Sequence, residues 1–240
     1  MRRYIYILAI VMAFIVSSCS NESYDTGDGI YSYLRADLVM AHSTSDKAID
    51  YAITDDSKRI VFNTPLKANW IQNADTLYRA ILYYKDKEEG AEPITSGYVP
   101  VFRIEPKSSD AIIDTMKTDP VKFESAWMSK NNRFLNISIG VKTGKTDNNK
   151  LQSIGVYSQQ LTENSNGTRD IYIRLTHNQN DIPEYYTSNY YLSIDMANFK
   201  PTDKLHLLIN TYKGEIEREF SPSPSTTEGD TDNNQQTTFN

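Results

Sequence analysis

Cysteine is almost absent from this chain of 240 residues, because Cys19 is its single thiol. Without a second cysteine no internal disulfide can form, so the fold must be stabilised by burial of apolar side chains. Histidine is nearly as scarce, and His42, His177 and His206 each stand alone in sequence. None of the three has the ligand spacing of a zinc motif, so we expect surface or strand-edge histidines. We predict no metal site and no cofactor.

The sequence also lacks the arrangements that mark common catalytic sites. No Gly-x-Ser-x-Gly turn is present. Gly144-Lys145-Thr146 lacks the earlier glycine of a phosphate-binding loop, and residues 147–149 indicate a hairpin turn where that loop needs a helix. The carboxylate pairs Asp55-Asp56 and Glu88-Glu89 lie in turn-like surroundings, where solvation explains them better than acid–base catalysis. We therefore predict no catalytic residues and a protein that is not an enzyme. A hydrolase with dispersed carboxylates is the enzymatic alternative.

Acidic side chains outnumber basic side chains. The chain has 25 Lys and Arg against 31 Asp and Glu, a formal net charge of −6, and no cluster of basic residues stands out. An acidic surface repels phosphate backbones, so we predict that nucleic acid is not a partner.

The first 18 residues differ from the rest. Arg2 and Arg3 precede an apolar run over 4–16, and the small residues Ser17 and Ser18 lead to Cys19. This order is typical of a secretory signal peptide. The apolar run is shorter than the roughly 20 residues that a helix needs to cross a bilayer about 30 Å thick. We therefore predict a signal peptide over 1–18, and its removal leaves 23 basic (25 − 2) against 31 acidic residues, or −8.

Cys19 stands where a bacterial lipoprotein is cut and acylated. Val16-Ser17-Ser18-Cys19 resembles a lipobox, with Val at the position where Leu is commonest. The alternative is an ordinary cleavage site beside an unrelated cysteine, but a lone exported thiol would be a liability. We predict that Cys19 is the lipid attachment site and that residues 19–28 are a polar tether. The chain is then a cell-envelope lipoprotein, anchored in a membrane that we expect to be the outer one. The sequence leaves open whether it faces the periplasm or the cell surface.

The first half of the remaining chain predicts a small β-barrel. Apolar and polar residues alternate over 30–40, which indicates a strand with one drier face. β-prone runs follow over 59–63, 77–84 and 98–104, and Pro100 within the last run indicates an edge strand or a bulge. Four or five short strands suffice for a barrel over 29–107.

A change of character after residue 107 marks the predicted domain boundary. Ser108-Ser109-Asp110 has the composition of a helix cap, followed by a short helix through Ile112, Ile113 and Met116. Regular alternation then predicts an antiparallel β-sandwich over 108–220. Its expected strands cover 121–128, 135–141, 154–156, 171–176, 192–196, 205–210 and 216–220. Residues 221–240 are polar and predict a disordered tail.

Tyrosine is abundant, with 17 Tyr against 8 Phe and 2 Trp. The candidate ligand-binding residues are Tyr185, Tyr186, Tyr190 and Tyr191, because exposed aromatic clusters stack on sugars or are buried at protein interfaces. The alternative, which β-propensity favours, is that these rings pack into the sandwich.

Several motifs resemble the NigD-like lipoproteins of Bacteroidetes. In the first half they are GDGIYSYLRAD (27–37), AITDD (52–56), Trp70 and ADTLYRA (74–80); in the second half they are RLTHNQ (174–179), YYLSI (190–194) and NTYKG (210–214). The resemblance covers nearly the whole chain between the signal peptide and the tail. It implies an N-terminal OB-like barrel and a C-terminal β-sandwich, and it carries over no catalytic residues.

The family's name comes from a bacteriocin gene cluster, where an immunity role was proposed. We therefore expect a non-enzymatic, lipid-anchored protein-interaction module, immunity-like or accessory, whose partner is an unidentified envelope protein. The alternative is a glycan-binding envelope lipoprotein.

Overall fold

The computed structural model of this chain describes residues 34–86, 90–108, 116–145 and 150–222. Apart from Leu34, the barrel and the sandwich lie in one compact unit that begins at Arg35. The signal peptide, Cys19, the tether, nearly all of the tail and most of the predicted helix after Ser108 fall outside the described residues. Within the described residues, no helix has the length and apolar character needed to span a membrane.

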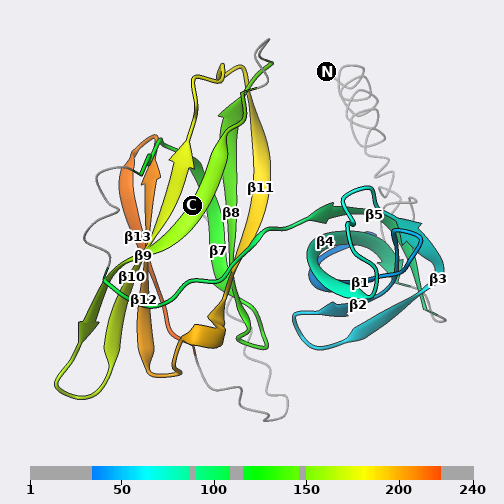
Figure 1. Cartoon of the computed structure of the whole chain (residues 1–240), viewed down its shortest axis with the longest axis horizontal. Helices are drawn as coiled ribbons and strands as arrows, with labels where there is room; N and C mark the ends of the chain where they lie inside the picture. Colours follow the sequence, from blue (N-terminus) through cyan, green and yellow to red (C-terminus); the bar gives the residue numbers. More distant parts are fainter. Residues whose placement is uncertain (1–33, 87–89, 109–115, 146–149, 223–240) are drawn as a thin grey trace, which may run out of the picture. The chain divides into compact units, whose positions relative to one another are not determined.

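The first part of the described chain is a closed barrel with the strand order β1-β2-β3-β5-β4 (Figure 1). Its strands are β1 (Leu34–Ser43), β2 (Ala48–Thr54), β3 (Arg59–Lys67), β4 (Thr76–Asp86) and β5 (Ala91–Tyr98). β4 and β5 are antiparallel, and β5 returns parallel to β3. The prediction of a small OB-like barrel is confirmed. Strand β2 was not predicted from the sequence.

The barrel core combines small and large apolar side chains. Alanines contribute much of its core, together with Val39, Ile49 and Leu82. On β1, Val39 and Ala41 face the barrel core, whereas on the opposite face Leu34 is exposed, Leu38 is buried and Met40 is half-buried. Alanines beside larger residues such as Leu82 let the inward-facing side chains fill a five-stranded barrel.

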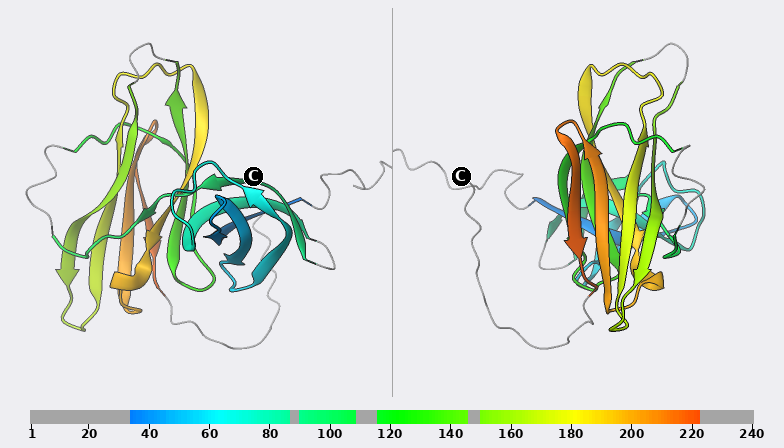
Figure 2. Two further views of the ribbon diagram at one scale, coloured as in Figure 1. Left: turned by 45° about the vertical axis from the view of Figure 1, so that its right-hand side comes forward. Right: turned by 90° about the vertical axis from the view of Figure 1, so that its left-hand side faces the viewer.

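The rest of the described chain forms two sheets packed face to face (Figure 2). One sheet has the order β6-β11-β8-β7, and the other has the order β13-β12-β10-β9. The bounds are β6 (Val101–Phe102), β7 (Lys122–Met128), β8 (Phe134–Thr143), β9 (Ser153–Glu163), β10 (Arg169–Asn178), β11 (Tyr186–Asp195), η1 (Met196–Asn198), β12 (Asp203–Thr211) and β13 (Gly214–Phe220). The predicted inward faces are confirmed for β8, β10, β11 and β12.

Two details of the predicted sandwich need correction. The sheets are mixed, because β10 pairs with β12 in parallel and β6 pairs with β11 in parallel. β6 also lies before the boundary predicted at 107/108, so assigning Val101–Phe102 to the barrel was wrong. The N–H of Ser193 donates to the carbonyl oxygen of Pro100 at 3.0 Å, and this bond joins the segment to the sandwich. β6 is nevertheless an edge strand, as Pro100 indicated.

A bulge in β7 decides where Trp127 points. The register with β8 shifts between Phe123 and Ser125, so the predicted alternation through Trp127 breaks there. Phe123, Ala126 and Met128 pack against the sandwich core, whereas the Trp127 side chain turns outward and is 36% exposed. The bulge therefore delivers an aromatic ring to the outer face of this sheet.

Candidate functional site

The outer face of the β6-β11-β8-β7 sheet is covered where it meets the barrel. The arginine side chain of Arg79, on β4, is fully buried there, beside Asn136 on β8 and Ser193 on β11. Its guanidinium makes a bidentate ion pair with Asp55, at 2.6 Å and 2.8 Å. Burying a charge is costly unless it is paired and hydrogen-bonded, so these partners have to hold it in place.

The remaining donors of Arg79 reach the sandwich. Nη2 donates to Asn136 Oδ1 at 2.9 Å, and Nε donates to Ser193 Oγ at 3.2 Å. The guanidinium carbon also lies 4.2 Å from the centre of the Phe134 ring. Asn136 in turn donates to Asp55 and accepts from Ser193. We call these four polar residues, Asp55, Arg79, Asn136 and Ser193, the buried lock.

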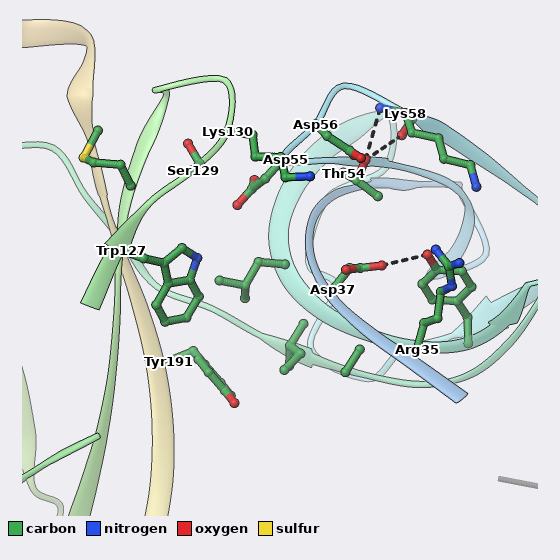
Figure 3. Close-up of a pocket in the computed structure, with 15 residues that line it drawn as sticks. Arg35, Asp37, Thr54, Asp55, Asp56, Lys58, Trp127, Ser129, Lys130 and Tyr191 are labelled. Carbon is green, nitrogen blue, oxygen red and sulfur yellow. Dashed lines mark hydrogen bonds between the residues drawn. The ribbon is translucent and has the colours of Figure 1, made fainter. Parts of the chain in front are cut away.

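A cleft of about 510 Å³ opens beside the buried lock (Figure 3). The sandwich contributes Trp127, Met128 and Tyr191 to its wall. The barrel contributes a wall with both positively and negatively charged side chains, namely Arg35, Asp37, Asp55, Asp56 and Lys58. Because the lock ties the two walls together, the cleft has a defined shape.

Each carboxylate of the cleft has a hydrogen-bond donor. Asp37 accepts from the hydroxyl of Tyr84 at 2.7 Å, and burial together with this bond raises the pKa of Tyr84. Asp56 accepts from the hydroxyl of Thr54, and this bond holds the pKa of Asp56 below its usual value. Asp55 neutralises Arg79. Asp55 is therefore more than a solvated turn residue, whereas Glu88 and Glu89 lie outside the described residues.

The predicted tyrosine cluster is split between surfaces. Tyr186 and Tyr190 lie on the same side of β11 as the core residue Leu192, and they are 59% and 45% exposed. Tyr185 precedes the strand and is 78% exposed. Tyr191 points to the opposite side of β11 and is the one member that lines the cleft. Tyr191 therefore lines the cleft together with Trp127, which was predicted to lie in a strand but not in a site.

His177 and His206 each lie within hydrogen-bond distance of neighbouring residues. His177 is buried, and its ring lies 3.2 Å from the carbonyl oxygen of Asp119 and 3.0 Å from the amide oxygen of Gln152, so a surface position was the wrong expectation. His206 lies between Glu217 and Asp170, at 2.6 Å and 3.2 Å. Burial opposes the charged ring, but these two carboxylates raise the pKa of His206 above its usual value.

His42 has a similar arrangement. Hydrogen bonds to Asp50 and then to Asp75 raise the pKa of His42, and its ring stacks on Tyr51 with centroids 4.5 Å apart. Across the described part of the chain, no group of three or more His, Cys, Asp or Glu could hold a metal ion.

Comparison with known proteins identifies the second domain. The model of the NigD-like C-terminal β-sandwich domain matches residues 103–221. Among solved structures, a NigD-like immunity protein from Bacteroides caccae is 19% identical with a TM-score of 0.55, covering 79% of this chain and 97% of that chain. Among curated proteins, none matches this chain.

Two further solved structures share the fold. A candidate toxin-related protein from Parabacteroides distasonis is 16% identical with a TM-score of 0.56, covering 81% of this chain and 96% of that one. A candidate lipoprotein from Bacteroides fragilis is 9% identical with a TM-score of 0.58, covering 81% and 99%. At these identities the likeness concerns the fold. The domain match over residues 103–221 identifies the chain as NigD-like through its C-terminal β-sandwich domain.

Proposed function

We propose that this chain is a non-enzymatic interaction protein of the bacterial cell envelope, and that its cleft binds a partner protein. The observation that carries the proposal is the pair of Trp127 and Tyr191 in a preformed cleft lined by charges of both signs. Tryptophan, tyrosine and arginine are the residues most enriched at binding hot spots. The shared fold with a NigD-like immunity protein and a toxin-related candidate favours an immunity-like role, in which the partner is a toxin.

The carboxylates of the cleft support binding better than hydrolysis. A general acid needs a carboxyl group that stays protonated, which requires a raised pKa. The hydrogen bond from Thr54 lowers the pKa of Asp56, and the ion pair with Arg79 occupies both oxygens of Asp55. These groups are therefore arranged as fixed charges and acceptors.

Anchoring through Cys19 is part of the proposal, because the solved relatives include a candidate lipoprotein. Metabolic labelling with a fatty acid analogue tests it in the native host. We expect the wild-type chain to incorporate the label and to float with membranes, and the Cys19→Ala chain to do neither. Labelling that persists in Cys19→Ala would refute the assignment.

Photocrosslinking in the native cells tests the cleft directly. A photoreactive phenylalanine replaces Trp127 in one version and Tyr212, which is 41% exposed on the loop between β12 and β13, in the matched control. We expect one reproducible protein adduct from position 127 and none of it from position 212. If position 127 captures nothing, or both positions capture the same set, the cleft is not the partner site.

Glycan binding is a second candidate function. Trp127 and Tyr191 both line the sandwich wall of the cleft (Figure 3), and aromatic rings in such a wall suit stacking on sugar rings. A glycan array probed with the wild-type chain and with Tyr191→Ala separates the two functions. Loss of a glycan signal in Tyr191→Ala favours this second candidate, and a wild-type chain without any signal removes it.

A further inference from the structure

The main-chain edge of β11 that faces away from β8 is not part of the cleft. β11 pairs with β8 along its whole length, from Tyr186 to Asp195, but with β6 only at Ser193 and Ile194. In the part of the chain that the structure describes, no strand flanks the other side of residues 186–192. Figure 1 shows β11 at the border of its sheet.

The main-chain groups that face this edge can be assigned. The N–H of Ser193 donates to Pro100, away from β8, and successive residues of a strand direct their main-chain groups to alternate sides. Thr187, Asn189 and Tyr191 therefore present their N–H and C=O groups at the edge. Such a row is a template for another extended backbone.

Three other border strands of the sandwich, β7, β9 and β13, carry features that prevent pairing. β7 has its bulge and the ion pair of Lys122 with Glu124, and β13 carries four charged residues between Glu215 and Glu219. β9 is covered at Ser158, which bonds both main-chain groups of Lys107. Residues 186–192, with the sequence YTSNYYL, have no charge, no proline and no register shift.

We infer that this edge pairs with the same edge of a second copy of the chain, in an antiparallel arrangement about a two-fold axis at Asn189. The sequence of the edge is complementary to itself in this register. Thr187 lies opposite the partner copy's position 191 and Ser188 opposite its position 190, while Tyr186 meets a leucine. Every such pair is uncharged and can pack or hydrogen-bond. Cross-strand side-chain pairs of this kind stabilise a sheet.

Local charge favours a second copy as the occupant. Lys142, across from Thr187 on β8, is neutralised by Glu184 at 2.9 Å. Two identical edges can therefore approach without like charges facing each other. An isologous edge contact of this kind is small, so we expect a weak dimer that forms at high concentration.

The inference is independent of the proposed partner binding. Tyr191 contributes its main chain to the edge and its ring to the cleft, whereas Asn189 does not line the cleft. A change at Asn189 therefore separates dimer formation from capture by a photoreactive group at position 127.

Sedimentation equilibrium of the full chain with Cys19→Ser, from low micromolar to high micromolar concentration, measures the association. The variant Asn189→Asp keeps the shape of the side chain and places two like charges opposite each other across the two-fold axis. The matched control is Ser125→Asp, which adds the same charge to the exposed edge strand β7. We expect wild type and Ser125→Asp to dimerise equally, and Asn189→Asp to bind itself several times more weakly, with recovery at high salt.

Two outcomes overturn the inference. One is a wild-type chain that stays monomeric across the whole range, and the other is a dimer that Asn189→Asp does not weaken. A disulfide assay tests the register in the same Cys19→Ser background. Opposed residues of a hydrogen-bonded antiparallel pair have Cα atoms about 5.5 Å apart, which a disulfide can bridge. Asn189→Cys should give covalent dimers under mild oxidation and Ser125→Cys should not, and equal crosslinking of the two would contradict the register.

Discussion

Removing the carboxylate of Asp55 should damage the protein more than removing the arginine that it pairs with. In Asp55→Ala the guanidinium of Arg79 stays fully buried without a counter-charge. Leaving one charge of a buried pair uncompensated costs about 3–5 kcal/mol. We therefore expect the free energy of unfolding to fall by about that amount.

Arg79→Met should cost less, about 1–3 kcal/mol. The Asp55 side chain is 18% exposed, so water can replace part of the lost interaction. Asn136 still donates to Asp55 and accepts from Ser193, and the methionine keeps an apolar stem against Phe134. The double variant should cost less than the sum of the single variants, with a coupling of about 1–3 kcal/mol.

The two tryptophans allow the assay to observe each domain separately. Trp70 follows β3 in the barrel and Trp127 is on β7 of the sandwich. Urea unfolding of Trp127→Phe reports the barrel, and urea unfolding of Trp70→Phe reports the sandwich. We expect coincident transitions with the intact lock and separated transitions with Asp55→Ala. An Asp55→Ala loss below about 1 kcal/mol, or one no larger than that of Arg79→Met, would refute this reasoning.

Three further variants test other parts of the structure. Because the pKa of His206 is raised in the folded protein, its contribution is complete below about pH 6.5 and is lost as the pH rises through the folded pKa. Urea unfolding at a series of pH values should show the free energy of unfolding falling as the pH rises through this range. His206→Gln should show a smaller fall, and the same dependence on pH in both proteins would contradict the pKa shift. Gly144→Ala brings a Cβ within 2.8 Å of the Pro183 carbonyl oxygen, so the midpoint of thermal unfolding should drop, with a cost of about 1–3 kcal/mol. Ile173→Ala empties part of the sandwich core and should cost about 2–5 kcal/mol, whereas the matched Val61→Ala, at a side chain 53% exposed, should stay within about 0.5 kcal/mol in the same assay.

The sequence predicts the fold best where strands alternate without interruption. Ile171, Ile173 and Leu175 lie on the inner face of β10 as expected, because a regular strand turns every second side chain to the same side. The pattern fails at the Phe123 bulge, where an extra residue reverses the alternation. The parallel pairing of β10 with β12 joins strands that the chain does not connect directly, and no local pattern records such pairing.

The cleft was harder to predict, because its parts come from distant segments. Trp127 is on β7, Tyr191 is on β11 and Asp37 is on β1, and only the tertiary structure brings them together. One signal was available. Arg79, Asn136 and Ser193 each interrupt a strongly apolar strand, and a polar residue in such a position is either exposed on the far face or buried with partners. The sequence alone cannot separate these two cases.

The buried lock also explains why the cleft has one geometry. An apolar contact between barrel and sandwich would tolerate sliding, because hydrophobic attraction has no direction. The guanidinium of Arg79 is satisfied only when Asp55, Asn136 and Ser193 occupy fixed positions around it. Any displacement would leave a buried charge without acceptors, at a cost of several kcal/mol. The lock therefore contributes specificity of arrangement more than net stability, and the pairing of Trp127 with the charged barrel wall depends on it.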